Sequence, residues 1–196
     1  IIKRTSYDKY NFRSNMDAKI TDNFDLSLDL SGYVSEQDEP GASAGVGSYA
    51  SIFQQALLSY PYLKPYTADG MPSINTAGNG NNNPIAARDL SGNNNVKKTY
   101  FQGNIAMKYQ LPFVKGLSVK LNASYLKNYT MQKKYFLTYD VYGWNQTTRQ
   151  GNVETGRIAN KVSLNQWFTE SEGYTIQPAL EYSNKFGKHA VSGLFL

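Results

Sequence analysis

The chain has 196 residues, of which 40% are apolar and 18% charged, so it is long enough for one domain and is neither disordered nor collagen-like. Its formal net charge is +5, and its Lys and Arg residues are scattered, which argues against nucleic-acid binding. It contains no Cys, which excludes disulfide frameworks, thiolate metal sites and cysteine nucleophiles. No apolar run reaches the roughly 18 residues of a transmembrane helix, but alternating strands can cross a membrane without such a run.

The first predicted element is a long antiparallel hairpin over residues 7–35, with a turn at residues 21–23. Apolar and polar residues alternate along both arms, which gives each strand one apolar and one polar face. The apolar face carries Tyr10, Phe12, Met16, Ala18 and Ile20 in the first arm and Phe24, Leu26, Leu28, Leu30 and Val34 in the second. A tilted strand needs roughly 9–11 residues to cross a bilayer, whereas strands of ordinary globular proteins have about 5–6. The long arms therefore favour a membrane barrel over a soluble β-sandwich, which would also alternate.

Residues 36–98 are predicted to form one long extracellular loop, because residues 36–95 are rich in Gly, Pro, Asn and Ser and lack sustained alternation. Within it, residues 48–60 have helical spacing, and we expect Ile52, Phe53, Ala56 and Leu57 to be buried against the barrel rim or a partner protein. Aromatic rings and polar side chains that could stack on a sugar and hydrogen-bond to it follow this helix. The candidate ligand-binding residues are Tyr62, Tyr66, Asp69, Asn81 and Asn82. Alternatively, the loop packs on its own aromatic residues or on a partner protein.

A second hairpin is predicted from residues 100–111 and 117–125, with a short turn at residues 112–116. An aromatic-rich connection through Tyr135 and Phe136 then extends to about residue 156, and parts of it are candidates to extend the strands beyond the bilayer. A long strand over residues 161–183, a turn at residues 184–189 and a last strand from Ala190 complete the chain. Short turns and long loops thus alternate, as in outer-membrane barrels, whose periplasmic turns are short and whose extracellular loops are long. The predicted fold is all-β: a segment of an antiparallel transmembrane β-barrel with about six long strands.

The two faces of these strands have different predicted surroundings. The apolar faces are expected to contact lipid, and the polar faces to line the lumen or contact another part of the protein. The residues predicted to face the lumen are Arg13, Asn15, Asp17, Asp29 and Asn122. Six strands are too few to close around a channel, so we expect the chain to be a segment of a longer protein. The absence of an initial Met and the apolar run at its end agree with this expectation.

Four short motifs give the chain a family resemblance. The run YNFRSNMD at residues 10–17 resembles the early barrel of SusC/RagA-type TonB-dependent transporters of Bacteroidetes. The runs PYTADG at residues 65–70, NPIA at residues 83–86 and NKFGKH at residues 184–189 are similar to later motifs of that family. No single motif is specific, but the four follow in the family's order over nearly the whole segment. One departure is Ala190, where Asn often follows the His, and it affects a turn residue only.

The resemblance implies properties that extend beyond these residues. Such proteins have an N-terminal plug inside a large barrel in outer-membrane lipid and couple to TonB across the periplasm. They pair with a SusD-like surface lipoprotein that covers the barrel, and they import oligosaccharides or peptides. The plug and the TonB box are expected to lie outside this segment. The resemblance therefore implies nutrient import at the bacterial outer membrane.

Other functional classes are compatible with parts of this pattern. A passive porin or an adhesin on a barrel, and a soluble all-β carbohydrate-binding module, are the alternatives. An enzyme is not expected, because the sequence shows no recognisable acid–base pair and its one His, His189, is in a predicted turn. Because this His is alone and the chain has no Cys, we expect no cofactor and no metal site, with calcium at Asp38 and Glu39 as the alternative to a solvated loop. Upstream sequence would separate an importer from a porin, and solubility without detergent would identify a soluble module.

Overall fold

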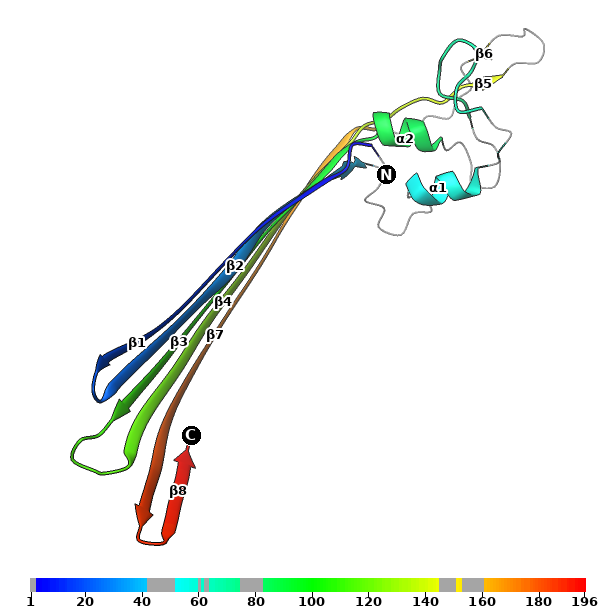
Figure 1. Cartoon of the computed structure of the whole chain (residues 1–196). Coiled ribbons are helices and arrows are strands. Elements are labelled where there is room, and N and C mark those ends of the chain that lie inside the picture. The colour runs from blue at the N-terminus through cyan, green and yellow to red at the C-terminus, as the bar shows by residue number, and fades with distance from the viewer. Residues whose placement is uncertain are drawn as a thin grey trace. The chain divides into compact units, whose positions relative to one another are not determined.

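The main element of the computed structural model is a six-stranded sheet of order β1-β2-β3-β4-β7-β8 (Figure 1). The structure describes residues 3–41, 52–59, 61, 64–74, 83–144, 151–152 and 161–196. The strands are β1 Ser6–Thr21, β2 Phe24–Pro40, β3 Gly92–Gln110, β4 Leu117–Phe136, β7 Ser163–Phe186 and β8 His189–Phe195. Two further short strands, β5 Gly143–Trp144 and β6 Gly151–Asn152, pair with each other, and the helices are α1 Ile52–Leu58 and α2 Pro84–Leu90. The predicted all-β antiparallel sheet is confirmed as an open sheet, with β1 and β8 at its edges. Closure into a barrel stays a prediction.

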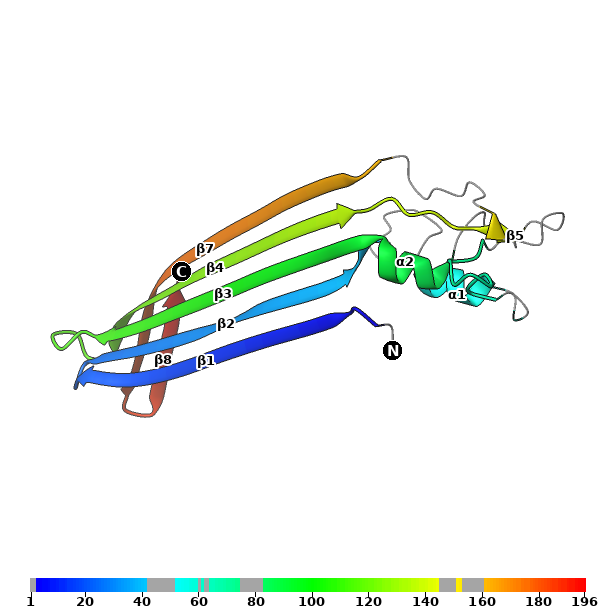
Figure 2. The same cartoon turned by 90° about the horizontal axis from the view of Figure 1, so that it is seen from above.

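Five strands of this sheet are much longer than those of ordinary globular proteins (Figure 2). The lengths are 16 residues for β1, 17 for β2, 19 for β3, 20 for β4 and 24 for β7. Each therefore exceeds the roughly 9–11 residues that cross a bilayer when tilted. No helix in the described ranges is long and apolar enough to cross a membrane.

The strands extend farther than the sequence pattern predicted. β2 continues to Pro40 and β3 begins at Gly92, so both enter the stretch that was predicted to be loop from residue 36. β4 includes Tyr135 and Phe136, which were assigned to a connection, and the last turn is shorter than residues 184–189 because β7 reaches Phe186. The cause is pairing between strands: Asn95 Nδ2 donates to Glu36 and to Asp38, both at 2.8 Å, where neither strand alternates.

The predicted helix is also shorter, and it buries less. α1 covers Ile52–Leu58, so only the middle of the range 48–60 is helical among the residues that the structure describes. Within this segment Ile52 is buried at 6% exposure, whereas Phe53 at 64%, Leu57 at 76% and Ala56 are exposed. Burial of these three against the barrel rim or a partner stays a prediction. A helix of two turns can bury only one narrow face against its neighbour. Here that face consists of Ile52 and Gln55, both buried. α2 was not predicted as a helix.

The chain divides into two compact units, and each has its own packing. Unit 2 comprises Lys9–Ser35, Lys98–Thr130 and Thr169–Leu196 and contains only strands and short turns. On one face the Phe12 ring lies 6.3 Å from the Phe101 ring and covers Gly32. A Cβ at Gly32 would lie 2.5 Å from the backbone oxygen of Tyr100 and 2.6 Å from the Phe12 ring, so this close approach requires glycine.

The opposite face of unit 2 is polar. The Tyr33 and Tyr100 rings stack at 5.4 Å, and Lys9 Nζ lies 4.3 Å from the centre of the Tyr33 ring. Farther along, Lys120 Nζ lies 2.8 Å from a Glu181 carboxylate oxygen. Because side chains alternate along a strand, Lys9 fixes the face of the other odd-numbered β1 residues, and Lys120 fixes that of Asn122. The sheet of unit 2 therefore has one apolar and one polar face.

Unit 1 comprises Ile1–Asp8, Glu36–Lys97 and Met131–Phe168, and it holds both helices and a small core. The core residues are Ile52, Ala86, Ala87, Tyr139 and Val141, with Ile74 and Phe136 packed against them. Burial raises the pKa of the Tyr139 hydroxyl to about 12, so it stays protonated at neutral pH. This core supports the loop that follows α1.

Candidate ligand-contact site

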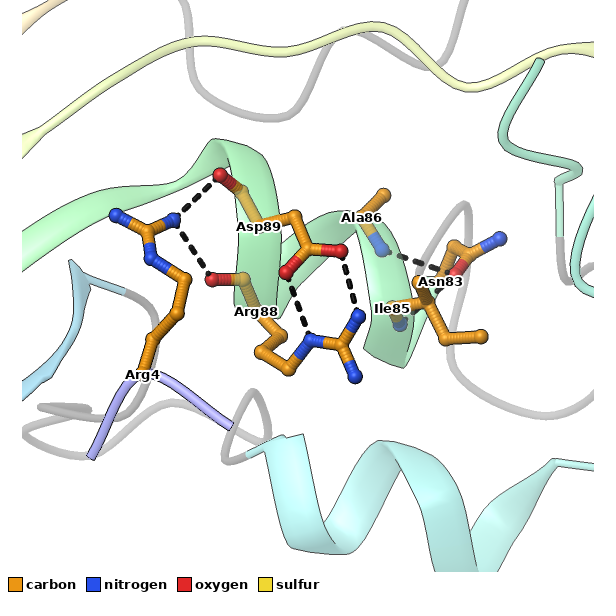
Figure 3. A network of polar contacts seen from close by, with 6 residues as sticks. All are labelled: Arg4, Asn83, Ile85, Ala86, Arg88 and Asp89. Atoms are coloured by element: carbon orange, nitrogen blue, oxygen red, sulfur yellow. Dashed lines mark hydrogen bonds and ion pairs between the residues drawn. The ribbon is translucent and has the colours of Figure 1, made fainter. Parts of the chain in front are cut away.

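Asn83 organises the loop of unit 1 from the start of α2 (Figure 3). It is 2% exposed, and its side-chain oxygen accepts from the backbone N–H of Ile85 at 2.9 Å and of Ala86 at 3.1 Å. Its side-chain nitrogen donates to the carbonyls of Pro65 at 2.8 Å and Ser73 at 2.9 Å. Asn is a preferred N-cap and Pro84 at the first helical turn lacks an N–H that would need a partner, so the sequence Asn-Pro starts a helix. One buried amide thus joins α2 to both ends of the preceding loop.

The loop from Pro65 to Ser73 is a small, closed turn. Gly70 N–H donates to Thr67 at 3.0 Å, Thr67 N–H donates to Met71 at 2.8 Å, and Ser73 N–H donates to Pro65 at 3.0 Å. Gly70 has a φ of 77°, a left-handed conformation that glycine adopts at little cost. The PYTADG motif is therefore a turn whose last position favours glycine.

The returning arm of this turn pairs with a distant segment. Ile74 N–H donates to the Tyr142 carbonyl at 2.8 Å, and Tyr142 N–H donates to the Pro72 carbonyl at 2.8 Å. Ser73 and Tyr142 form an isolated parallel bridge. Tyr142 follows the buried Val141, so the core and the turn are held together by backbone bonds.

A cavity of about 510 Å³ lies between these segments. Its described lining residues are Lys64, Tyr66, Thr67, Ala68, Ser73, Ile74 and Tyr142. Ligand pockets typically have roughly 300–1,000 Å³ and combine apolar and aromatic walls with a few polar groups. Tyr66 is 43% exposed, so its ring is accessible to a bound molecule. The arrangement can stack a ring of a ligand on tyrosine and offer it hydroxyl groups and an ammonium group.

The other end of α2 is held from the start of the chain (Figure 3). Arg4 lies just before β1, and its guanidinium donates to the carbonyl of Arg88 at 3.1 Å and to that of Asp89. These carbonyls lack partners within the helix, and a cation there also complements the helix dipole. Hydrogen bonds from Arg88 at 2.7 and 2.6 Å lower the pKa of the Asp89 carboxyl, which is therefore ionised at neutral pH.

The predicted ligand-binding residues do not all lie at the cavity. Tyr66 lines the cavity, whereas Asp69 lies in the exposed turn and is not among the described lining residues. Tyr62, Asn81 and Asn82 lie outside the described residues. Of the residues predicted to face a lumen, Arg13, Asn15 and Asp17 are on the β1 face that carries Lys9. Asp29 shares its face of β2 with Tyr33, and Asn122 shares its face of β4 with Lys120. All five are exposed, and their lumen role stays a prediction.

Sequence reasoning assigned no ligand role to Tyr142, Lys64 or Ile74, which line the cavity with Tyr66. Tyr142 lies in the predicted connection that extends to about residue 156. Its partner in the structure is Ser73, far away in the sequence, and no local pattern predicts such a pairing. Lys64 directly precedes the PYTADG motif, which was the available signal.

Comparison with known proteins gives one distant relative. No protein-family model matches the chain. The chain is 26% identical over 194 residues to TonB-dependent receptor P3 of Formosa agariphila, a match that covers 98% of this chain and 18% of the relative. The chain thus spans less than a fifth of the length of that protein. Over nearly its whole length, the chain is distantly related to a TonB-dependent receptor.

Proposed function

We propose that the chain is part of the barrel wall of a TonB-dependent importer of the SusC/RagA type in a bacterial outer membrane. Its nutrient is an oligosaccharide or a peptide, and its partners are TonB, contacted through a region outside this segment, and a SusD-like surface lipoprotein. The distant relationship to a TonB-dependent receptor supports the general class. The observation that carries the membrane assignment is the apolar face of unit 2.

That face has aromatic residues at both ends of an aliphatic band. At one end Phe101 contacts Phe12 and Tyr125, each with ring centres 6.3 Å apart, and at the other Phe24 contacts Tyr109 at 6.4 Å. Eight residues separate Phe101 from Tyr109 on β3, and the same number separates Tyr174 from Tyr182 on β7. Eight residues extend roughly 26 Å, and a tilt of about 40° leaves roughly 20 Å along the membrane normal. Aromatic girdles flank an apolar band of about 25 Å in outer-membrane barrels.

A charged cluster marks one edge of this band. Beyond Tyr125 on β4, Lys127 Nζ lies 2.6 Å from Glu170 and 2.5 Å from Glu172 of β7. The Tyr125 hydroxyl lies 3.4 Å from the same Glu172. Within the band, by contrast, Tyr174 is 82% and Ile176 65% exposed. Large apolar side chains exposed in rows between polar boundaries fit contact with hydrocarbon, since soluble monomers rarely expose so large a patch.

The cavity of unit 1 is the proposed point of contact with the nutrient. Tyrosine rings suit the apolar face of a sugar or an aromatic side chain of a peptide, and the hydroxyl groups suit hydrogen-bonding partners. Lys64 at the wall favours a ligand that is neutral or negatively charged. Asn83 gives the site a fixed shape before a ligand arrives, which reduces the entropy cost of binding.

The first test concerns orientation. Residues 1–196 contain no Cys, so Asp69→Cys and Asp22→Cys place single thiols in two exposed turns. The proposal puts the loop of Asp69 outside the cell and the turn of Asp22 in the periplasm. A membrane-impermeant maleimide should therefore label Asp69→Cys on intact cells and Asp22→Cys only after the outer membrane is opened. The reverse pattern would invert the proposed topology.

The second test concerns import. Tyr66→Ala in the full-length protein should reduce energy-dependent uptake of the cognate nutrient at least several-fold, because the cavity loses an aromatic wall. Uptake is measured in cells at equal surface abundance of the protein, with and without functional TonB.

Two controls keep this result specific. Tyr66→Phe retains the ring and should retain most of the uptake, and Asp69→Ala, in the turn rather than the cavity wall, should change little. Uptake that persists without TonB would support a passive porin instead. Unchanged uptake in Tyr66→Ala, with TonB dependence intact, would remove the cavity from the proposal but leave import standing.

A further inference from the structure

The turn between β3 and β4 and the turn between β7 and β8 lie against each other in unit 2. Ser183 N–H donates to the Gly116 carbonyl at 2.8 Å, and Asn184 Nδ2 donates to the Lys115 carbonyl at 3.5 Å. Gly116 has a φ of 88°, and a Cβ there would overlap the Ser183 carbonyl oxygen, so glycine permits this close approach. These hydrogen bonds hold the two turns together as one surface.

This surface, residues 112–116 and 184–189, is named here the basic turn pair because it carries positive charge without any Asp or Glu. Its lysines are Lys115, Lys185 and Lys188. All three are exposed, and none forms an ion pair with a residue in the described part of the chain. The turn between β1 and β2 differs, because Lys19 Nζ lies 3.2 Å from the Asp22 carboxylate. The unpaired positive charge of the short turns therefore lies on the basic turn pair.

Large apolar side chains are exposed on the same two turns. Phe113 is 77% and Phe186 54% exposed, and Val114, which directly precedes Lys115, is exposed as well. Because side chains alternate along a strand, Phe186 shares its face of β7 with Tyr182 and Ile176, which belong to the apolar face proposed to contact lipid. The exposed rings therefore continue the apolar band toward the ends of the strands.

The spacing along β7 places the basic turn pair at the depth of lipid headgroups. Phe186 follows Tyr182, which lies at one end of the apolar band, by four residues. Four residues of a strand extend roughly 13 Å, which leaves about 10 Å along the membrane normal at a tilt of about 40°. The polar layer on each side of a bilayer is roughly 5–8 Å thick. A lysine of these turns therefore lies within reach of phosphate groups, with its ammonium group at the membrane surface.

We propose that the basic turn pair binds the headgroup of an anionic phospholipid in the leaflet that the short turns face. Lys115 and Lys188 supply the ammonium groups for its phosphate, and the rings of Phe113 and Phe186 contact its glycerol and upper acyl chains. The combination of lysines with exposed rings favours a lipid over a soluble anion, for which lysines alone would suffice. Continuity with the apolar face supports the same ligand. The inference rests on the proposed membrane assignment, but not on import or on the cavity of unit 1.

The test is photo-crosslinking of the full-length protein in vesicles of phosphatidylethanolamine with a minor share of phosphatidylglycerol. A photoreactive phenylalanine analogue replaces Phe186, and mass spectrometry identifies the lipids that become attached to it. Phosphatidylglycerol should be enriched in these adducts at least about twofold over its share in the vesicle, because lysines near a membrane surface attract anionic lipids. The same analogue in place of Ile176, within the apolar band, should attach both lipids in proportion to their abundance.

Lys115→Gln/Lys188→Gln should abolish the enrichment at position 186, while lipid adducts at position 176 persist and report a sheet folded in the bilayer. Lys19→Gln is the matched control. It removes a lysine from the third short turn, where Asp22 already pairs with it, and should leave the enrichment unchanged.

Two results would overturn the headgroup site alone. In one, lipids attach at both positions, but those at position 186 follow the vesicle composition. In the other, position 186 attaches protein instead of lipid while position 176 attaches lipid. Absence of lipid adducts at position 176 would contradict the membrane assignment, and the headgroup site with it.

Discussion

Leu121→Arg is expected to destabilise the folded full-length protein by about 2–4 kcal/mol, the cost of an arginine on the lipid face near the bilayer midplane. Leu121 lies on β4 midway between Leu117 and Tyr125, on the face that carries the aromatic contact of Tyr125 with Phe101. Its surroundings in this interpretation offer the guanidinium neither water nor a carboxylate. The measurement is the free energy of unfolding in lipid vesicles from a denaturant titration.

Asn122→Arg is the matched control, since it introduces the same side chain one residue later and on the opposite face. Asn122 is exposed and lies on the same face of β4 as Lys120, so an arginine there would meet water and polar groups. Exposed substitutions of this kind usually change stability by less than about 0.5 kcal/mol. Equal losses for the two variants would contradict the assignment of lipid to one face. A larger loss for Asn122→Arg would reverse it.

Asn83→Ala is expected to loosen the ligand-contact site and to destabilise the start of α2. Removing an Asn N-cap costs about 0.5–2 kcal/mol. The carbonyl of Ser73 also loses this donor, and the carbonyl of Pro65 keeps only the bond from Ser73 N–H, so the turn is held less firmly. Hydrogen exchange of the full-length protein should show faster exchange at the amides of Ile85 and Ala86, and at those of the turn that ends at Ser73.

Asn83→Asp separates the two roles of this side chain. A carboxylate oxygen can still accept from the amides of Ile85 and Ala86, so α2 should stay protected. The same group cannot donate, and its second oxygen would face the carbonyls of Pro65 and Ser73. The turn should therefore exchange quickly while the helix start does not. Equal protection of both regions in all three proteins would show that Asn83 does not organise the loop.

The sequence was informative where one face of a strand is apolar and the other polar. Along β1 and β4 the alternation predicts both the strand and its two faces, because a shift by one residue would exchange them. It fails at the far end of β2, where Glu36 and Asp38 are held by Asn95, 59 and 57 residues away in the sequence. Such pairings have no local signal, so strand ends were placed too early.

The candidate site shows the same division between local and distant information. The Asn-Pro pair at the start of α2 carries a cap signal that could have predicted this helix, although its seven residues give little periodicity. Tyr66 was found because it is an aromatic residue in a recognisable turn motif. Tyr142 reaches the cavity through a parallel bridge to Ser73, and only the folded chain shows this neighbour. Asp69 was predicted to bind ligand because a carboxylate suits sugar hydroxyl groups. Its position in the turn places it outside the described cavity wall.

The contact of Arg4 with the end of α2 has a consequence for the order of folding. The hydrogen bond from Arg4 to the Arg88 carbonyl joins residues 84 positions apart. Closing a loop of this length costs more entropy than forming a helical turn or a short hairpin, so such contacts form late unless nearby structure brings the ends together. The hairpin of β1 and β2 is local and can form first. The hydrogen bond from Arg4 to the end of α2 then forms only after the start of β1 is in place. A chain truncated just before β1, and therefore without Arg4, would assemble this region without that hydrogen bond.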